Sequence, residues 1–210
     1  MYDALLFDLD GTLIDTESLA LASGLAAFAA VGFPVEPDFM HRLIGVDQPS
    51  AAVLIRNHLP DIDLPALHRH WGAGFNAGVD QGLPLKAGTL ELLAAAPGHL
   101  HRAVVTSSGR TEALRKIAVA GLTPSFPTVV TVDDVTRPKP DPEPYLLAAR
   151  MLGVDPARCL VFEDSETGAE AAHRAGCVVV QVPDMVPSSR RWAHHVADDL
   201  MSGARLAGLF

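Results

Sequence analysis

Residues 4–12 read ALLFDLDGT and contain the first indication of the fold. Its first four residues are apolar and the run stops at Asp8, which is typical of a strand buried on both faces of a parallel sheet. Residues two apart in an extended segment face the same side, so Asp8 and Asp10 can place both carboxylates in one site. Two such groups repel each other unless a cation lies between them or one is protonated. Taken alone, the pattern is equally consistent with an ordinary turn.

Four more short apolar runs end in polar residues: 103–105 before Thr106-Ser107-Ser108, 128–130 near Asp133-Asp134, 159–162 before Glu163-Asp164, and 177–180 near Asp184. Helical patterns over 111–120, 143–152 and 167–175 lie between them. Strands that alternate with helices of about ten residues predict an α/β fold with a doubly wound parallel sheet. Ligands of such sheets bind beyond the carboxyl ends of the strands, where these polar residues gather.

Residues 16–84 break this alternation. Leu21, Leu25 and Phe28 form a helical stripe, and 51–58 and 64–79 also have helical patterns, separated by prolines at 49, 60 and 65. We therefore expect a catalytic core made of 1–15 and 85–210, with a helical cap inserted over 16–84 that folds over the active edge as a lid. The tail from Val186 onward has a partly helical pattern.

Composition narrows the class of protein. The chain has 210 residues, of which 49% are hydrophobic and 20% charged, so we expect one domain, or one with a substantial insert. A net charge of −9 argues against nucleic acid as a partner. Cys159 and Cys177 each begin an apolar run, which predicts buried thiols rather than a disulfide framework. The sequence shows neither a signal peptide nor a membrane span, so we expect a soluble cytoplasmic protein with no membrane partner.

Glu163 and Asp164 follow a strand that we expect to end at the same edge as Asp8 and Asp10. Adjacent acids at a strand end are usually solvated loop residues. On this edge, however, they become candidates for a cation site made of oxygen atoms alone. Mg²⁺ keeps several of its waters, so two or three carboxylates are enough to bind it.

Two further segments have two interpretations each. The hydroxyls and backbone N–H groups of Thr106-Ser107-Ser108 can form an anion cradle or simply cap a helix. Residues 137–144 have a proline at every second position, which fits a polyproline ligand. The pattern also fits a stiffened loop that holds Lys139 and is followed by a helix capped by Asp141. We prefer the stiffened loop because it explains more residues.

Together, these four segments resemble the haloacid dehalogenase-like hydrolase superfamily. Its four motifs are matched in order by Asp8-x-Asp10-Gly11-Thr12, Thr106, Lys139 and Glu163-Asp164. The surrounding sequences, such as FDLDGTLIDTE and KPDPEPYLLAARMLG, are similar to the branch of phosphatases and beta-phosphoglucomutases. The resemblance covers residues 1 to about 183 and is weakest in the insert. It implies a Rossmann-like sheet with a helical cap inserted after the first motif.

The resemblance also implies roles for these residues. Asp8 would be the nucleophile, and Asp10 the general acid that protonates the leaving group and then the base that activates water. The second motif, Thr106 with Ser107 and Ser108, would bind the phosphoryl group. Lys139 would neutralise charge on Asp8 and on that group. Mg²⁺ would lie between Asp8, the main-chain carbonyl of Asp10 and Asp164, with Glu163 as a direct or water-mediated partner.

Candidate substrate contacts also lie in the insert. Glu17 follows the first motif and can reach substrate or flank the helix that begins there. Residues 45–48, Gly45-Val46-Asp47-Gln48, resemble the cap loop that faces substrate in this branch. The mutases of the branch carry an arginine at the position of Gln48, a histidine at that of Ala20 and commonly valine at that of Thr12. These three departures favour hydrolysis over mutase activity, although Arg42 or Arg56 could supply the missing charge.

We therefore expect a Mg²⁺-dependent phosphatase that acts on a small phosphorylated metabolite such as a sugar phosphate. A beta-phosphoglucomutase-like phosphomutase is the alternative. A dehalogenase is disfavoured because such relatives lack the second aspartate, which is present here as Asp10. A non-catalytic binding protein is disfavoured because no motif residue is missing. The sequence leaves the oligomeric state open between a monomer and a dimer.

Overall fold

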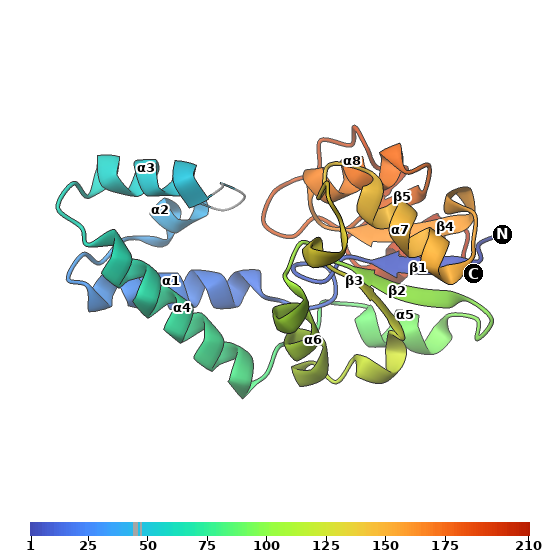
Figure 1. The fold of residues 1–210 in the computed structure, drawn as a ribbon, viewed down its shortest axis with the longest axis horizontal. Coiled ribbons are helices and arrows are strands. Elements are labelled where there is room, and N and C mark those ends of the chain that lie inside the picture. Colours follow the sequence, from blue (N-terminus) through green and yellow to red (C-terminus); the bar gives the residue numbers. More distant parts are fainter. Residues whose placement is uncertain (44–45, 47) are drawn as a thin grey trace. The chain divides into compact units, whose positions relative to one another are not determined.

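The computed structural model describes residues 1–43, 46 and 48–210. Two compact units make up the chain (Figure 1). Unit 1 combines Met1–Asp15 with Pro84–Phe210, and unit 2 is Thr16–Leu83.

Unit 1 is built on a six-stranded sheet in the order β3-β2-β1-β4-β5-β6, in which all neighbouring strands are parallel. Its strands are β1 Ala4–Phe7, β2 His101–Val105, β3 Thr128–Val130, β4 Cys159–Glu163, β5 Val178–Gln181 and β6 His195–Val196. This confirms the predicted α/β Rossmann-like sheet and its first five strands. β1 pairs with both β2 and β4, opposing Phe7 to Val104 and to Phe162. The residues that follow these three strands therefore meet at one edge.

Helices cover the sheet and connect its strands: α5 Thr89–Ala95, α6 Arg110–Val119, α7 Glu143–Leu152, α8 Glu166–Arg174 and α9 Leu200–Leu206, with short 3-10 turns at Thr123–Ser125, Val132–Asp134 and Pro156–Arg158. α7 and α8 pack on the face that includes Leu6 and Val161. On the other face, the rings of Phe7 and Phe162 stack at 5.0 Å. All of β1 is buried, because apolar side chains contact it from both faces.

The C-terminal tail completes the sheet, which the sequence pattern did not predict. β6 contains only two residues and pairs with β5, opposing His195 to Val180. His194, just before it, contacts the Val179 amide through Nδ1 at 3.0 Å. The predicted burial of both cysteines is confirmed.

Unit 2 is helical, with α1 Glu17–Ala30, α2 Pro37–His41, α3 Gln48–His58 and α4 Leu64–Gln81. Its core includes Phe28 and Phe39, whose rings meet edge to face at 5.9 Å. The indole of Trp71 packs against this core and donates to the Ala20 carbonyl at 3.1 Å. Pro49 and Pro65 lie in the first turns of α3 and α4 rather than between helices, because the first turn of a helix does not need their missing N–H groups. No helix among the described residues is long and apolar enough to cross a membrane.

Candidate active site

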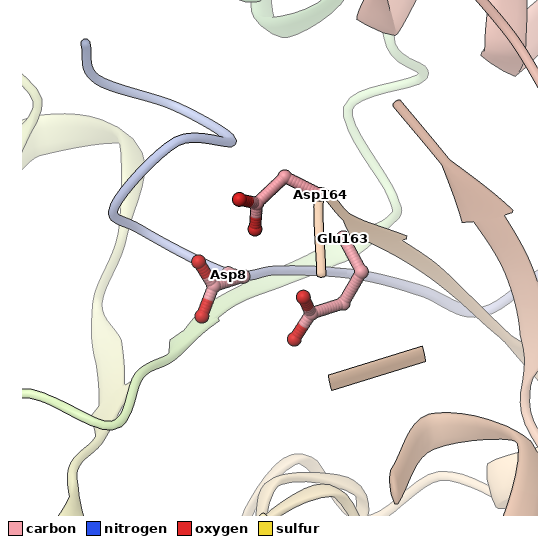
Figure 2. A group of neighbouring side chains, drawn as sticks. All are labelled: Asp8, Glu163 and Asp164. Atoms are coloured by element: carbon pink, nitrogen blue, oxygen red, sulfur yellow. The ribbon is translucent and has the colours of Figure 1, made fainter. Parts of the chain in front are cut away.

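Three carboxylates converge at the carboxyl ends of β1 and β4. Asp8 follows β1, Glu163 is the last residue of β4, and Asp164 comes next (Figure 2). One oxygen from each lies within 4.8 Å of the others. Glu163 is fully buried and Asp8 is 7% exposed. Because this much negative charge is unstable in a buried place, the cluster requires cations nearby.

Lys139 supplies one of those cations. Its side chain is 4% exposed, and Nζ donates to Asp8 Oδ1 at 2.6 Å, Glu163 Oε1 at 2.6 Å and the Val105 carbonyl at 2.9 Å. An ammonium group has three protons, so every one has an acceptor. Lys139 therefore connects the ends of β1, β2 and β4 through a single atom.

Burial and neighbouring charged groups shift the pKa values of Lys139 and Asp8. Burial alone would lower the pKa of Lys139, but the Asp8 and Glu163 carboxylates outweigh it and hold that pKa above its usual value. Burial raises the pKa of Asp8, and the Lys139 ammonium opposes part of the rise. Lys139 thus keeps its charge beside the carboxylate of Asp8.

Glu163 is held by several donors. Its Oε1 also accepts from the Tyr145 hydroxyl at 2.6 Å, and its Oε2 accepts from the Ser165 hydroxyl at 3.1 Å. Burial raises the pKa of Tyr145 well above its usual range, so the phenol keeps the proton that it donates. Because both of its oxygens accept hydrogen bonds, the Glu163 carboxylate is fixed in place and in turn holds Lys139.

The proline-rich loop before α7 fixes Lys139 in place. The Asp141 carboxylate accepts from the Glu143 amide at 3.0 Å, at the first turn of α7, although Pro142 occupies the cap position itself. The Glu143 carboxylate accepts from the Thr136 and Arg137 amides at 3.0 Å. These bonds close the loop around the buried lysine, in agreement with the stiffened-loop interpretation.

Asp10 lies in a second cluster on the same edge. Its Oδ2 accepts from the Ser108 hydroxyl at 2.8 Å, and its Oδ1 accepts from Lys116 Nζ at 2.8 Å. Lys116 belongs to α6 and also donates to Glu112 at 2.6 Å. Burial would lower the pKa of Lys116, but Asp10 and Glu112 raise it. Ser108, expected to contact substrate, thus directs its hydroxyl to Asp10.

The remaining second-motif residues follow β2 directly. Thr106 is buried, and its Oγ1 accepts from the Ser108 amide at 3.0 Å. This bond turns the chain so that Ser107 lies exposed at the edge. The register of β1 and β2, which opposes Phe7 to Val104, brings this segment to the same edge of the sheet as Asp8.

Asp164 lies against the turn after β1. Its Oδ1 accepts from the Thr12 hydroxyl at 3.3 Å. Gly11 has φ +81°, and a Cβ atom there would lie 2.5 Å from Asp164 Oδ2, so both backbone and space require glycine. Burial, and then the charge of Glu163, raise the pKa of Asp164 to about 7.

The site's donor atoms fit Mg²⁺. Asp8 and Asp164 present carboxylate oxygens in a buried place, and Mg²⁺ prefers oxygen ligands. Asp184 Oδ2 lies 3.5 Å from where a Gly11 Cβ would stand and, among the described side chains, is buried without a hydrogen-bond partner. Asp184 Oδ1 pairs with Lys86 at 2.7 Å. An unpaired carboxylate oxygen beside Asp164 suits a donor such as a metal-bound water.

All three lysines of the chain are at this edge. They are Lys86, Lys116 and Lys139. Each pairs with a carboxylate within 2.8 Å, on Asp184, Asp10 and Asp8 respectively. The edge thus contains both the acids and the buried cations that phosphoryl chemistry uses.

The structure gives less support to the predicted substrate contacts in unit 2 than to the residues of the sheet edge. Glu17 begins α1, and Gln48 is the first residue of α3. Gly45 and Asp47 lie outside the described residues.

Comparison with known proteins agrees with this geometry. The model of the haloacid dehalogenase-like hydrolase family matches residues 5–182, which span all four motifs. The chain belongs to this family. The resemblance in the motifs is thereby confirmed.

Several curated relatives of the chain are named as phosphatases. The fructose-1-phosphate phosphatase of Escherichia coli is 32% identical over 185 residues, which cover 86% of this chain and 96% of that protein. A phosphorylated carbohydrates phosphatase of Thermotoga maritima is 32% identical over 186 residues, 83% of this chain and 82% of that protein. Among solved structures, a Thermotoga maritima protein provisionally described as a beta-phosphoglucomutase is 27% identical, with TM-score 0.84 over 98% of both chains. The predicted class, a phosphatase-type hydrolase, is the one these relatives support.

Several residues of the site carried no signal in the sequence. Lys116 lies within an ordinary helical pattern, and Tyr145 occupies a core position of α7. Asp184 was noted only as a polar residue after a strand. The available signal for Lys116 was its position on the buried side of an amphipathic helix, because a buried charge needs a partner.

Proposed function

We propose that this protein is a Mg²⁺-dependent phosphatase that hydrolyses a small phosphorylated metabolite of the sugar phosphate class through an aspartyl-phosphate on Asp8. The main support is the bridge that Lys139 forms between Asp8 and Glu163, beside Asp164. This arrangement suits an attack by one carboxylate on an anionic group. The phosphatase relatives support the substrate class.

In the proposed first half-reaction, an Asp8 carboxylate oxygen attacks phosphorus. The bond between phosphorus and the ester oxygen breaks, and that oxygen takes a proton from Asp10. Thr106 and the Ser107 amide hold phosphoryl oxygens, and Lys139 offsets the negative charge that Asp8 must approach. The phosphoryl group is then covalently bound to Asp8.

In the second half-reaction, Asp10 accepts a proton from water as that water attacks phosphorus. The bond between phosphorus and Asp8 breaks, which releases inorganic phosphate and restores Asp8. Asp10 is ready to act as the acid again because it holds the proton from water. One carboxyl thus serves both steps.

Mg²⁺, when bound, supplies positive charge that lets an anionic nucleophile approach an anionic phosphate. We propose Asp8, the Asp10 carbonyl and Asp164 as its ligands. Glu163 then acts mainly by holding Lys139, as its bonds to Lys139 and Tyr145 suggest. We propose further that unit 2 selects the substrate through Glu17, Gly45, Asp47 and Gln48. Ser107 of unit 1 is a further proposed contact residue.

A screen of phosphorylated metabolites, with phosphate release measured with and without Mg²⁺, tests this proposal. We expect turnover that depends on Mg²⁺ and is highest, by kcat/KM, for sugar phosphates. Asp8→Asn is the matched control, because an amide keeps the shape of the side chain but is not a nucleophile. We expect that variant to fold normally and lose turnover to near background. Substantial activity in Asp8→Asn free of deamidation would refute the role of Asp8.

A further inference from the structure

Lys116 is a buried cation that none of the four motifs includes. Its side chain is 5% exposed, and Nζ lies 2.8 Å from Asp10 Oδ1, 3.3 Å from the Ser108 hydroxyl and 2.6 Å from Glu112. Burying a charged side chain is costly, so such a group is retained where its contacts compensate. Two of these contacts, with Asp10 and Ser108, belong to the second cluster of the edge.

The two donors to Asp10 reach different oxygens. Lys116 donates to Oδ1, and the Ser108 hydroxyl donates to Oδ2. The last torsion of an aspartate side chain is broad, so one donor alone leaves its carboxyl plane free to turn. Donors on both oxygens fix that plane. Lys116 also contacts the Ser108 oxygen, so it holds the second donor as well.

We propose that Lys116 is a positioning residue that sets the orientation of the Asp10 carboxyl for proton transfer. The proposal rests on the function proposed above, in which Asp10 is the general acid and base. Lys116 acts through Asp10, whereas Lys139 acts on the nucleophile and the phosphoryl group. Each lysine therefore pairs with a different aspartate of the first motif: Lys139 with Asp8, and Lys116 with Asp10.

This role predicts that the loss on removing Lys116 depends on the leaving group. An alkoxide leaves poorly unless it is protonated, so alkyl phosphates need a well-placed acid. A dinitrophenolate leaves without a proton. General acid catalysis contributes roughly 10²- to 10⁴-fold, so a misplaced acid costs a part of that factor, about 10- to 100-fold for alkyl esters.

The test compares Lys116→Met with wild type on a series of phosphate monoesters, from alkyl phosphates to 2,4-dinitrophenyl phosphate. The measured quantity is kcat/KM, which reports the first phosphoryl transfer. We expect a loss of about 10- to 100-fold for alkyl esters and less than about threefold for the dinitrophenyl ester. Glu112→Gln is the matched control, since it removes the exposed partner of Lys116 and leaves the contact with Asp10. We expect it to stay within about twofold of wild type.

An equal loss for every ester would overturn the proposal, because it would mean a general structural defect. Wild-type enzyme that hydrolyses none of the esters would instead refute the proposed function. A crystal structure of Lys116→Met separates these cases without an activity assay. We expect the Asp10 carboxyl to leave the Ser108 hydroxyl while the backbone stays in place. An unchanged Asp10 would refute the positioning role in either case.

Discussion

A Cβ atom on Gly168 would lie 1.8 Å from Oε1 of Glu163. Gly168 is in the first turn of α8, whose N-cap Ser165 accepts from the Gly168 amide at 3.1 Å and donates to Glu163. The helix therefore begins directly against the carboxylate that anchors Lys139. No side chain fits between them.

Gly168→Ala should displace the Glu163 carboxylate and with it Lys139. Overpacking of a buried site costs about 1–3 kcal/mol, so we expect a lower free energy of unfolding by that amount. We also expect kcat/KM to fall at least tenfold, since the loss of about 1.4 kcal/mol of transition-state stabilisation corresponds to that factor. Urea unfolding and phosphate release measure the two effects.

Gly98→Ala is the control for this prediction. Gly98 is exposed in the same unit, and a Cβ there meets no atom within 4 Å. We expect its stability and activity to match wild type. A Gly168→Ala variant that also matched wild type would contradict the close packing at Glu163.

Asp164→Asn should weaken Mg²⁺ binding more than Glu163→Gln does. Asp164 Oδ1 accepts from the Thr12 hydroxyl at 3.3 Å, whereas the Glu163 oxygens accept from Lys139, Tyr145 and Ser165. We expect Asp164→Asn to raise the Kd for Mg²⁺ and Glu163→Gln mainly to lower thermal stability. Calorimetric titration with Mg²⁺ and a melting curve for each variant separate the outcomes. Equal Kd values for wild type and Asp164→Asn would remove Asp164 from the ligands.

Mg²⁺ affinity should rise with pH up to about 7. The pKa of Asp164 is raised from 3.8 to about 7, so the metal-free fold binds this proton more tightly than the unfolded chain does. Without metal, the contribution of Asp164 to the free energy of unfolding therefore falls as pH rises from about 4 to 7. Mg²⁺ must displace the proton below pH 7, which weakens binding about tenfold per pH unit.

Titrations at pH 6, 7 and 8 in two buffers of different ionisation enthalpy measure this effect. We expect about one proton to be released per Mg²⁺ at pH 6 and almost none at pH 8. Asp164→Asn should remove the part of this release that comes from Asp164 and leave that of Asp8, whose pKa burial also raises. A Kd that stays constant from pH 6 to 7 would show that Asp164 is already ionised.

Hydrolysis should outrun isomerisation. The family resemblance matches Gln48 to the arginine that the mutases carry, and an amide lacks the charge and the forked donors that hold a second phosphate. The assay supplies beta-glucose 1-phosphate with a catalytic amount of the 1,6-bisphosphate and follows glucose 6-phosphate and free phosphate. Isomerisation faster than phosphate release by orders of magnitude would favour the mutase.

The sequence was enough to predict those residues of the candidate site that lie at or just after the end of a strand. Asp8, Thr106 and Glu163 each come at or just after the end of a short apolar run, and parallel pairing of β1 with β2 and β4 brings such ends together. That inference needs only the order and direction of strands. Strand order and direction are therefore enough to predict the sheet edge and the acids on it.

Other features depended on tertiary structure. Lys116 reaches Asp10 only because α6 packs beside the turn after β1, and its local pattern is that of any amphipathic helix. Tyr145 meets Glu163 through the packing of α7 on the sheet. β6 is two residues long, too short to show an alternating pattern.

The placement of the lysines has a practical consequence for chemical labelling. Amine-reactive reagents attack only the uncharged amine and must reach it. All three lysines pair with carboxylates, but the Lys116 and Lys139 side chains are only 5% and 4% exposed, whereas that of Lys86 is 23% exposed. Reductive methylation or acetylation should therefore mark Lys86 first. Because Lys116 and Lys139 become accessible only when the edge of the sheet opens, mass spectrometry of their modification over time would record local opening of the active site itself.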